Sequence, residues 1–190
     1  MKVYIKKLLR EGLDESILKS PFKGRNILYH SSGFGQGIGI LTDNRIYAAT
    51  RQTISTKLNP SNPNYNENSK NYSGVSLTRD NSLNFNDMQF ILNGDLIKRD
   101  FGNRLVPHDF YKSYGDKTKA NTNRTDAYES EEFLIGALEP LSKYLLAIRF
   151  IPTYGTLEEF RNNDPEGYDL LKETIGDIPT YDENFNQINL

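Results

Sequence analysis

Three short groups of polar side chains, far apart along the chain, could do chemistry together. The first is His30-Ser31-Ser32, the second lies at residues 76–79 (Ser-Leu-Thr-Arg), and the third is the acidic cluster at residues 129–132. An imidazole, hydroxyls and a carboxylate in one site suit the ionisation of a sugar C–N bond, because the carboxylate offsets the positive charge that develops on the sugar. The imidazole and the hydroxyls can hold the sugar and the leaving group in place.

Each polar group is predicted to sit at the edge of a β-strand. Ile27-Leu28-Tyr29 are good strand formers, bounded by Gly24 and the glycine-rich residues 33–39, and they lead directly into His30. Val75 and Leu77 alternate with hydroxyl residues, which predicts a strand with one polar face. The acidic cluster runs into an apolar segment at residues 133–135. A simpler interpretation of His30 is an ordinary strand-end histidine that bonds nearby backbone.

The rest of the chain supplies few helices and several short strands. Further strands are predicted at residues 45–49, 88–92 and 143–151, and a helix at residues 156–175 with a break near Pro165. The glycines at alternate positions 33–39 predict a flexible turn, and Asn93-Gly94-Asp95 another. Residues 50–73 and 112–126 are predicted to be long polar loops, and the last fifteen residues to be irregular.

This order of elements predicts the fold class and the organisation of the chain. We expect an α+β fold with a mixed or antiparallel sheet, few helices and long loops, and not a doubly wound nucleotide-binding fold. Apolar residues near helical spacing predict an amphipathic helix within residues 1–20, and residues 21–190 are expected to form a single domain. The N-terminal helix would pack on the domain edge or dock on a partner.

Composition limits the classes of function. The 190 residues contain no cysteine, so disulfides and cysteine-bound zinc are ruled out. The two histidines, His30 and His108, lack acidic residues at metal-ligand spacing, and we expect no metal site. No apolar run approaches the roughly 20 residues of a membrane span. The formal net charge of −2 predicts no broad footprint for nucleic acid, although Lys112–Arg124 is locally basic.

At the three polar groups the sequence resembles a known family. Residues 28–32 (Leu-Tyr-His-Ser-Ser) resemble the histidine motif of the ADP-ribosyltransferases related to diphtheria toxin and the poly-ADP-ribose polymerases, with Ser31 where the motif has glycine. Ser76-Leu77-Thr78-Arg79 resembles the family's second marker strand. Glu131-Glu132 before an apolar strand resembles the glutamate marker. The resemblance implies the family's split mixed or antiparallel sheet, and NAD as the substrate.

The resemblance also implies roles for individual residues. His30 would bind the ribose and nicotinamide region of NAD, and Ser32 would contact the far ribose, with Ser31 beside them. Ser76 and Thr78 would line the nicotinamide side, and Arg79 would face a phosphate or a loop. One glutamate would be catalytic: Glu132, because its apolar strand follows directly, or Glu131. Residues 129–131 also fit the Glu-x-Glu pattern of arginine-modifying relatives.

The acceptor and the setting stay open at this stage. The enzyme would transfer ADP-ribose to a macromolecular acceptor, either protein or nucleic acid. The first 13 residues resemble the N-termini of phage proteins, and we expect a cytoplasmic location, in the host if the protein is phage-encoded. Two alternatives remain: a non-catalytic binding or virion-associated protein with the same fold, and an NAD-dependent RNA 2′-phosphotransferase.

Overall fold

The computed structural model describes residues 21–22, 24–50, 73–81, 86–107 and 131–190. The predicted N-terminal helix, most of the loop at 50–73, His108, the basic stretch and the loop at 112–126 lie outside these residues. None of the helices in the described part of the chain has the length and apolar composition needed to cross a bilayer. All three polar groups fall at least partly within the described part, so their placement can be compared with the predictions.

One sheet organises the described residues. Its order is β5-β6-β3-β1-β4-β7-β8-β9, with β2 paired to β3. Every pairing is antiparallel except that of β7 with β8, which is parallel. The strands are β1 (Ile27–Ser32), β2 (Ala49–Thr50), β3 (Ser73–Thr78), β4 (Met88–Asn93), β5 (Leu105–Pro107), β6 (Glu131–Ile135), β7 (Leu145–Phe150), β8 (Thr180–Tyr181) and β9 (Gln187–Ile188). The fold is therefore α+β with a mixed, mostly antiparallel sheet, as predicted.

Three of the described helices, α5, α6 and α7, begin at a side-chain cap. The α-helices are α3 (Phe34–Thr42), α5 (Gly94–Phe101), α6 (Leu157–Asn163) and α7 (Pro165–Ile175), and the 3₁₀ turns are η2 (Gly102–Arg104) and η5 (Leu141–Lys143). Asn93, predicted to be in a turn, instead caps α5 by accepting a bond from the amide of Leu96. Thr156 and Glu159 form a capping box on α6. Asp164 caps α7 with Pro165 at its first position, so the predicted break near Pro165 is confirmed.

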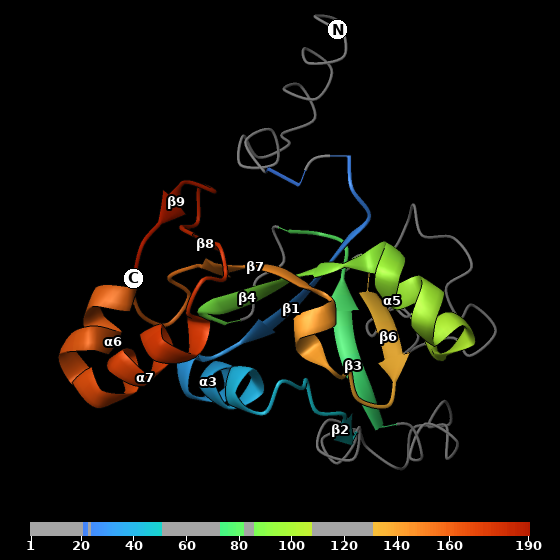
Figure 1. Ribbon diagram of the computed structural model, residues 1–190, viewed down its shortest axis with the longest axis horizontal. Coiled ribbons are helices and arrows are strands. Elements are labelled where there is room, and N and C mark those ends of the chain that lie inside the picture. The colour runs from blue at the N-terminus through green and yellow to red at the C-terminus, as the bar shows by residue number, and fades with distance from the viewer. Residues whose placement is uncertain (1–20, 23, 51–72, 82–85, 108–130) are drawn as a thin grey trace, which may run out of the picture.

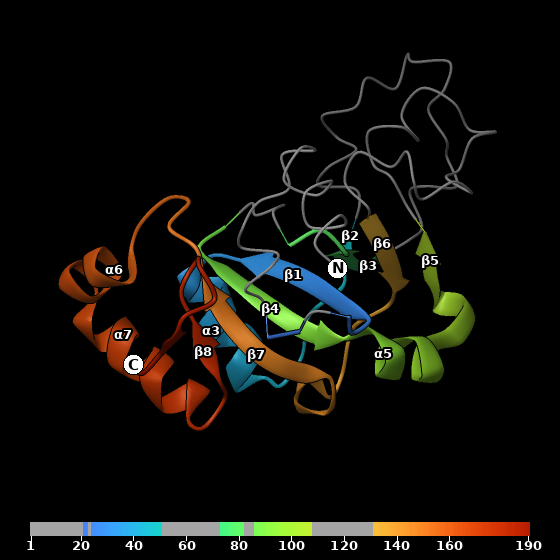
Figure 2. The ribbon, with the colours of Figure 1, turned by 90° about the horizontal axis from the view of Figure 1, so that it is seen from above.

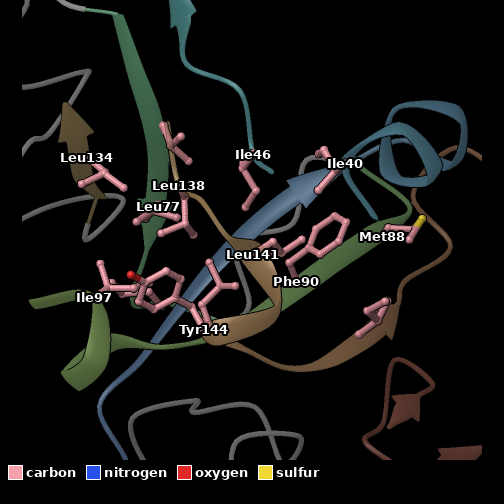
Figure 3. Close-up of a cluster of buried hydrophobic side chains, with 14 of the residues drawn as sticks. Ile40, Ile46, Leu77, Met88, Phe90, Ile97, Leu134, Leu138, Leu141 and Tyr144 are labelled. Carbon is pink, nitrogen blue, oxygen red and sulfur yellow. The ribbon is translucent and has the colours of Figure 1, made fainter. Parts of the chain in front are cut away.

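The two faces of the sheet bury different apolar clusters. Alternation along the strands puts Leu28, Leu77 and Leu134 on the face that we call the core face, in one large cluster with Phe90. Helices α3, α5 and α7 add side chains to this cluster and lie on the same side of the sheet (Figure 2). Figure 3 shows side chains of β3, β4 and β6 gathered in it. Ile27, Tyr29 and Ile91 belong to a smaller cluster on the opposite face.

Phe34–Thr42 form helix α3, so the flexible turn predicted at the glycine-rich residues 33–39 is wrong. Phe34, Ile38 and Leu41 follow helical spacing and join the core-face cluster. A Cβ added at Gly37 would lie 2.5 Å from Sδ of Met88, so the missing side chain lets α3 sit close to β4. Burial of the apolar stripe outweighs the weak helix propensity of glycine, about 1 kcal/mol per residue. The strand predicted at 45–49 is reduced to a bridge between Ile46 and Leu138 and to β2.

The sheet has a weak joint between β1 and β3. Strand β1 pairs along its whole length with β4, and β3 pairs with β6 from Gly74 to Thr78. Between β1 and β3, only Tyr29 and Thr78 are in register. Figure 1 shows the two strands diverging toward the C-terminal end of β1. We call this joint the seam; it divides the sheet into a β1–β4–β7 half and a β3–β6–β5 half.

Candidate functional site

His30 lies at the seam and bridges it. Its Nδ1 is 3.0 Å from the backbone oxygen of Ser76 on β3, where no ladder bond joins the two strands. A carbonyl oxygen can only accept, so Nδ1 carries the hydrogen and donates it. Burial lowers the pKa of His30, and the bond to Ser76 offsets this only in part. The ring is therefore neutral near pH 7, with Nε2 as a hydrogen-bond acceptor.

The predicted hydroxyl residues are distributed over both faces of the sheet. Ser32 shares the core face with Leu28, is buried, and donates to the backbone oxygen of Gly33 at 3.3 Å. Ser31 lies two positions after Tyr29 and therefore on the same face as Tyr29, opposite the core face; it is partly buried. Ser76 is exposed on that face, whereas Thr78 is buried and its Oγ1 accepts from the amide of Asp80 at 3.0 Å. The opposite face of the seam therefore carries three of the four hydroxyls.

Glu132 lies on the core face and is paired with an arginine. It stands opposite Leu77 in the β3–β6 register, and its side chain is only 2% exposed. Arg79, just past the end of β3, donates through Nε to Glu132 Oε1 and through Nη1 to Oδ1 of Asn26. Taking a carboxylate out of water costs several kcal/mol unless it is paired, so Arg79 makes the burial of Glu132 possible.

The three groups lie at the same level of the sheet. Tyr29 is in register with Thr78, and Thr78 with the backbone of Glu131. The next residues along the strands are His30 and Glu132. Both side chains lie on the core face, because they are two positions from Leu28 and Leu134, which belong to the core-face cluster. Two inter-strand spacings separate them, which puts their Cα atoms at least about 10 Å apart, because β1 and β3 diverge beyond Tyr29. Leu77, which is fully buried, lies between them on the same face.

The structure joins the predicted residues into two sets. His30 and Ser76 are in direct contact, as are Arg79 and Glu132. The side chain of Glu131 lies outside the described residues, so its predicted role is not tested, and the predicted phosphate contact of Arg79 stays a prediction. Sequence reasoning missed Asn26 and its partner Asp95, 2.7 Å away. No local pattern could have found them, because the contacts join residues 26, 79, 95 and 132.

The described residues offer no cluster of metal ligands. No three histidine, aspartate or glutamate side chains among them are grouped to hold an ion. The acidic residue of the site, Glu132, is bound to Arg79, and a guanidinium excludes a metal ion from the oxygen that it contacts. The polar groups that remain at the seam, an imidazole and hydroxyls, suit hydrogen bonding to a polar organic ligand.

Comparison of the chain with protein-family models, with curated proteins and with solved structures found no match. The family resemblance of the three motifs is therefore not supported by any overall similarity. What the site does has to be inferred from its own residues and from their placement on the sheet.

Proposed function

We propose that this protein is an NAD-dependent ADP-ribosyltransferase, which cleaves the nicotinamide–ribose bond and passes ADP-ribose to a macromolecular acceptor. The observation that carries the proposal is the convergence of the three motifs. They are far apart in the sequence, yet they lie on the neighbouring strands β1, β3 and β6 at one level of the sheet.

Two further features support the proposal. The resemblance implies a split sheet, and the described sheet is paired at only one residue pair between β1 and β3. The imidazole of His30 lies at this seam, where the strands diverge. An imidazole on the same face as the hydroxyl of Ser32 is suited to hold a ribose, whose hydroxyls both donate and accept hydrogen bonds.

Each residue has a role in this reaction. Glu132 supplies the negative charge that stabilises the oxocarbenium-like ribose as nicotinamide leaves. His30, neutral at pH 7, accepts a hydrogen bond from a ribose hydroxyl through Nε2. Of the predicted hydroxyl residues, Ser32 shares the core face with His30 and Glu132 and provides a hydroxyl for the ribose. Ser31, Ser76 and Thr78 lie on the opposite face of the sheet, so a contact with the same ligand is not proposed for them. The acceptor is a protein or a nucleic acid, and the cytoplasm is the proposed location.

The test is nicotinamide release from NAD by the full-length chain, with and without cell lysate, together with transfer of labelled ADP-ribose. Glu132→Gln and Glu131→Gln are assayed separately, because both stand as candidates. Removing the catalytic charge is expected to lower the rate about 100- to 1000-fold. Glu173→Gln, an exposed acid on α7, is the matched control and should leave the rate unchanged. Equal rates in the wild type and in both glutamate variants would refute the catalytic assignment.

One observation favours the alternative of a non-catalytic binding protein with the same fold. The carboxylate of Glu132 is buried and bound by Arg79, as expected also for a purely structural ion pair. This alternative predicts that the protein binds no NAD, and that it captures a partner through residues 1–20. Titration calorimetry with NAD separates the two functions, because the transferase must bind NAD even when no acceptor is present.

A further inference from the structure

Four residues from separate segments form one chain of polar contacts beneath the seam. Glu132 on β6 accepts from Arg79, which follows β3. Arg79 donates also to Oδ1 of Asn26, the residue before β1. Asn26 in turn donates through Nδ2 to Asp95 Oδ1 in the first turn of α5, at 2.7 Å. We call this set the Arg79 clamp. It links both halves of the sheet to the start of α5.

Asn26 is held from two sides, and this fixes its amide. Its backbone oxygen accepts from the amide of Gly94 at 2.8 Å. A Cβ at Gly94 would lie 2.8 Å from that oxygen and 2.9 Å from Asn26 Oδ1, so only glycine allows this close approach. Because Asp95 can only accept, Nδ2 must face it, which turns Oδ1 toward the guanidinium. Asn26 is therefore oriented to receive Arg79.

The guanidinium is held by the same geometry. Arg79 uses Nε for Glu132 and Nη1 for Asn26, so two points of its rigid plane are fixed. Its side chain is 27% exposed, against 2% for Glu132. An arginine that served mainly to bind a substrate phosphate would have its donors directed to solvent. Here two of the donors are directed at protein acceptors, and one of these is the buried carboxylate.

We infer that Arg79 and Asn26 are positioning residues, which hold the Glu132 carboxylate in one orientation below the seam. They act through Glu132 and do not themselves bind NAD. This inference rests on the proposed function, and it assigns Arg79 a role different from the phosphate contact that the sequence suggests. Misplacing a catalytic group by about 1 Å can lower a rate about 100-fold without weakening binding.

The first experiment separates positioning from substrate binding by steady-state kinetics of NAD cleavage with the full-length chain. Arg79→Lys keeps the charge but loses the rigid two-point geometry, and Asn26→Ala removes the acceptor that orients Arg79. Both should lower kcat about 10- to 100-fold while KM stays within about twofold. Arg99→Lys and Asn103→Ala, at exposed positions, are matched controls and should change neither constant. A raised KM with unchanged kcat, or no effect on either, overturns the inference.

The second experiment tests the clamp without using activity. Thermal unfolding is measured for Arg79→Met, Glu132→Met and the double variant. Arg79→Met leaves the buried carboxylate of Glu132 without its partner, and Glu132→Met leaves the guanidinium of Arg79 without its carboxylate. The double variant removes both groups, so it should have a higher melting temperature than the Arg79→Met single variant. If the decrease in melting temperature of the double variant equals the sum of the two single decreases, the pair does not act as a unit and the inference is overturned. If the wild type cleaves no NAD but the double variant recovers stability, the proposed function fails while the clamp stands as a structural pair.

Discussion

The two halves of the sheet differ in what they carry. In the β1–β4–β7 half, β4 is paired in long register with both neighbours, and its residues Phe90, Ile91 and Leu92 are fully buried. In the β3–β6–β5 half the apolar residues are interrupted by Ser76, Thr78 and Glu132. On its core face the first half is therefore an apolar frame covered by α3 and α7 (Figure 2).

The difference shows how a small sheet can hold polar groups without losing its core. On the core face, His30, Ser32 and Glu132 lie at the seam or in the half that is joined to the frame at one residue pair. The frame itself buries a bonded polar pair, Gln89 and Arg149, on its opposite face. Buried polar groups are costly unless they are bonded, and here His30 and Glu132 have protein partners. The frame supplies stability, so the seam can keep hydrogen-bonding groups in place for a ligand.

The largest effect is expected from Gly74→Ala, which pushes β3 and β6 apart in the β3–β6–β5 half of the sheet. An added Cβ would overlap the backbone oxygen of Leu134 and lie 2.5 Å from the ring of Phe133. Strand backbone cannot move aside as a flexible side chain can, so we expect a loss of about 2–3 kcal/mol in the free energy of unfolding. Urea denaturation measures it. A loss below that of Gly37→Ala would show that the β3–β6–β5 half is the softer of the two.

A smaller effect is expected from Gly37→Ala in the apolar frame. The new Cβ would meet the side chain of Met88, which is fully buried and has little room to move. Overpacking is partly offset by the gain of about 1 kcal/mol in helix propensity, so the net loss should be about 1 kcal/mol. Gly35→Ala, in the same helix with open space around it, is the matched control and should stabilise by about 0.5–1 kcal/mol.

The smallest effect is a pH dependence of stability that comes from His30 at the seam. Burial lowers its pKa in the folded protein, so below about pH 6.5 the unfolded chain takes up a proton that the folded chain does not. The free energy of unfolding therefore has its full value, as far as His30 is concerned, above about pH 6.5, and it decreases as the pH falls below that value. His30→Gln should lack this component. Urea denaturation from pH 5 to 8 tests it, and parallel curves for the two proteins would contradict it.

Much of the fold could be predicted from local patterns. The strands at β1, β3, β4, β6 and β7 follow from alternation or short apolar runs, and the paired helices α6 and α7 from their spacing and from Pro165. The last fifteen residues, predicted to be irregular, contain β8 and β9, which are too short to give a pattern. Arg149 secures this segment: it donates to the backbone oxygen of Glu183 and lies 4.1 Å from the ring centroid of Phe185.

The candidate site could be predicted only in part. The residue types and their order predict His30, the Ser76–Thr78 pair and the two glutamates as candidates, and the structure brings their strands together. The sequence could not show that Glu132 is bound by Arg79, or that Asn26 and Asp95 complete the set. Those contacts depend on which strands are neighbours and on their register, and local patterns do not carry that information.

The sequence by itself determined which segments alternate and where the C-terminal helical pattern breaks at Pro165, and it supplied candidate residues for the ionisation of a sugar bond. Only the tertiary structure decided that residues 34–42 are a helix, because the stripe of Phe34, Ile38 and Leu41 is stabilised by the sheet on which it packs. The tertiary structure also decided where the pairing of β1 with β3 ends and that Arg79 is the partner of Glu132. The physical reason is the same in each case: burial and pairing energies arise between residues far apart in the chain, and they exceed the local preferences.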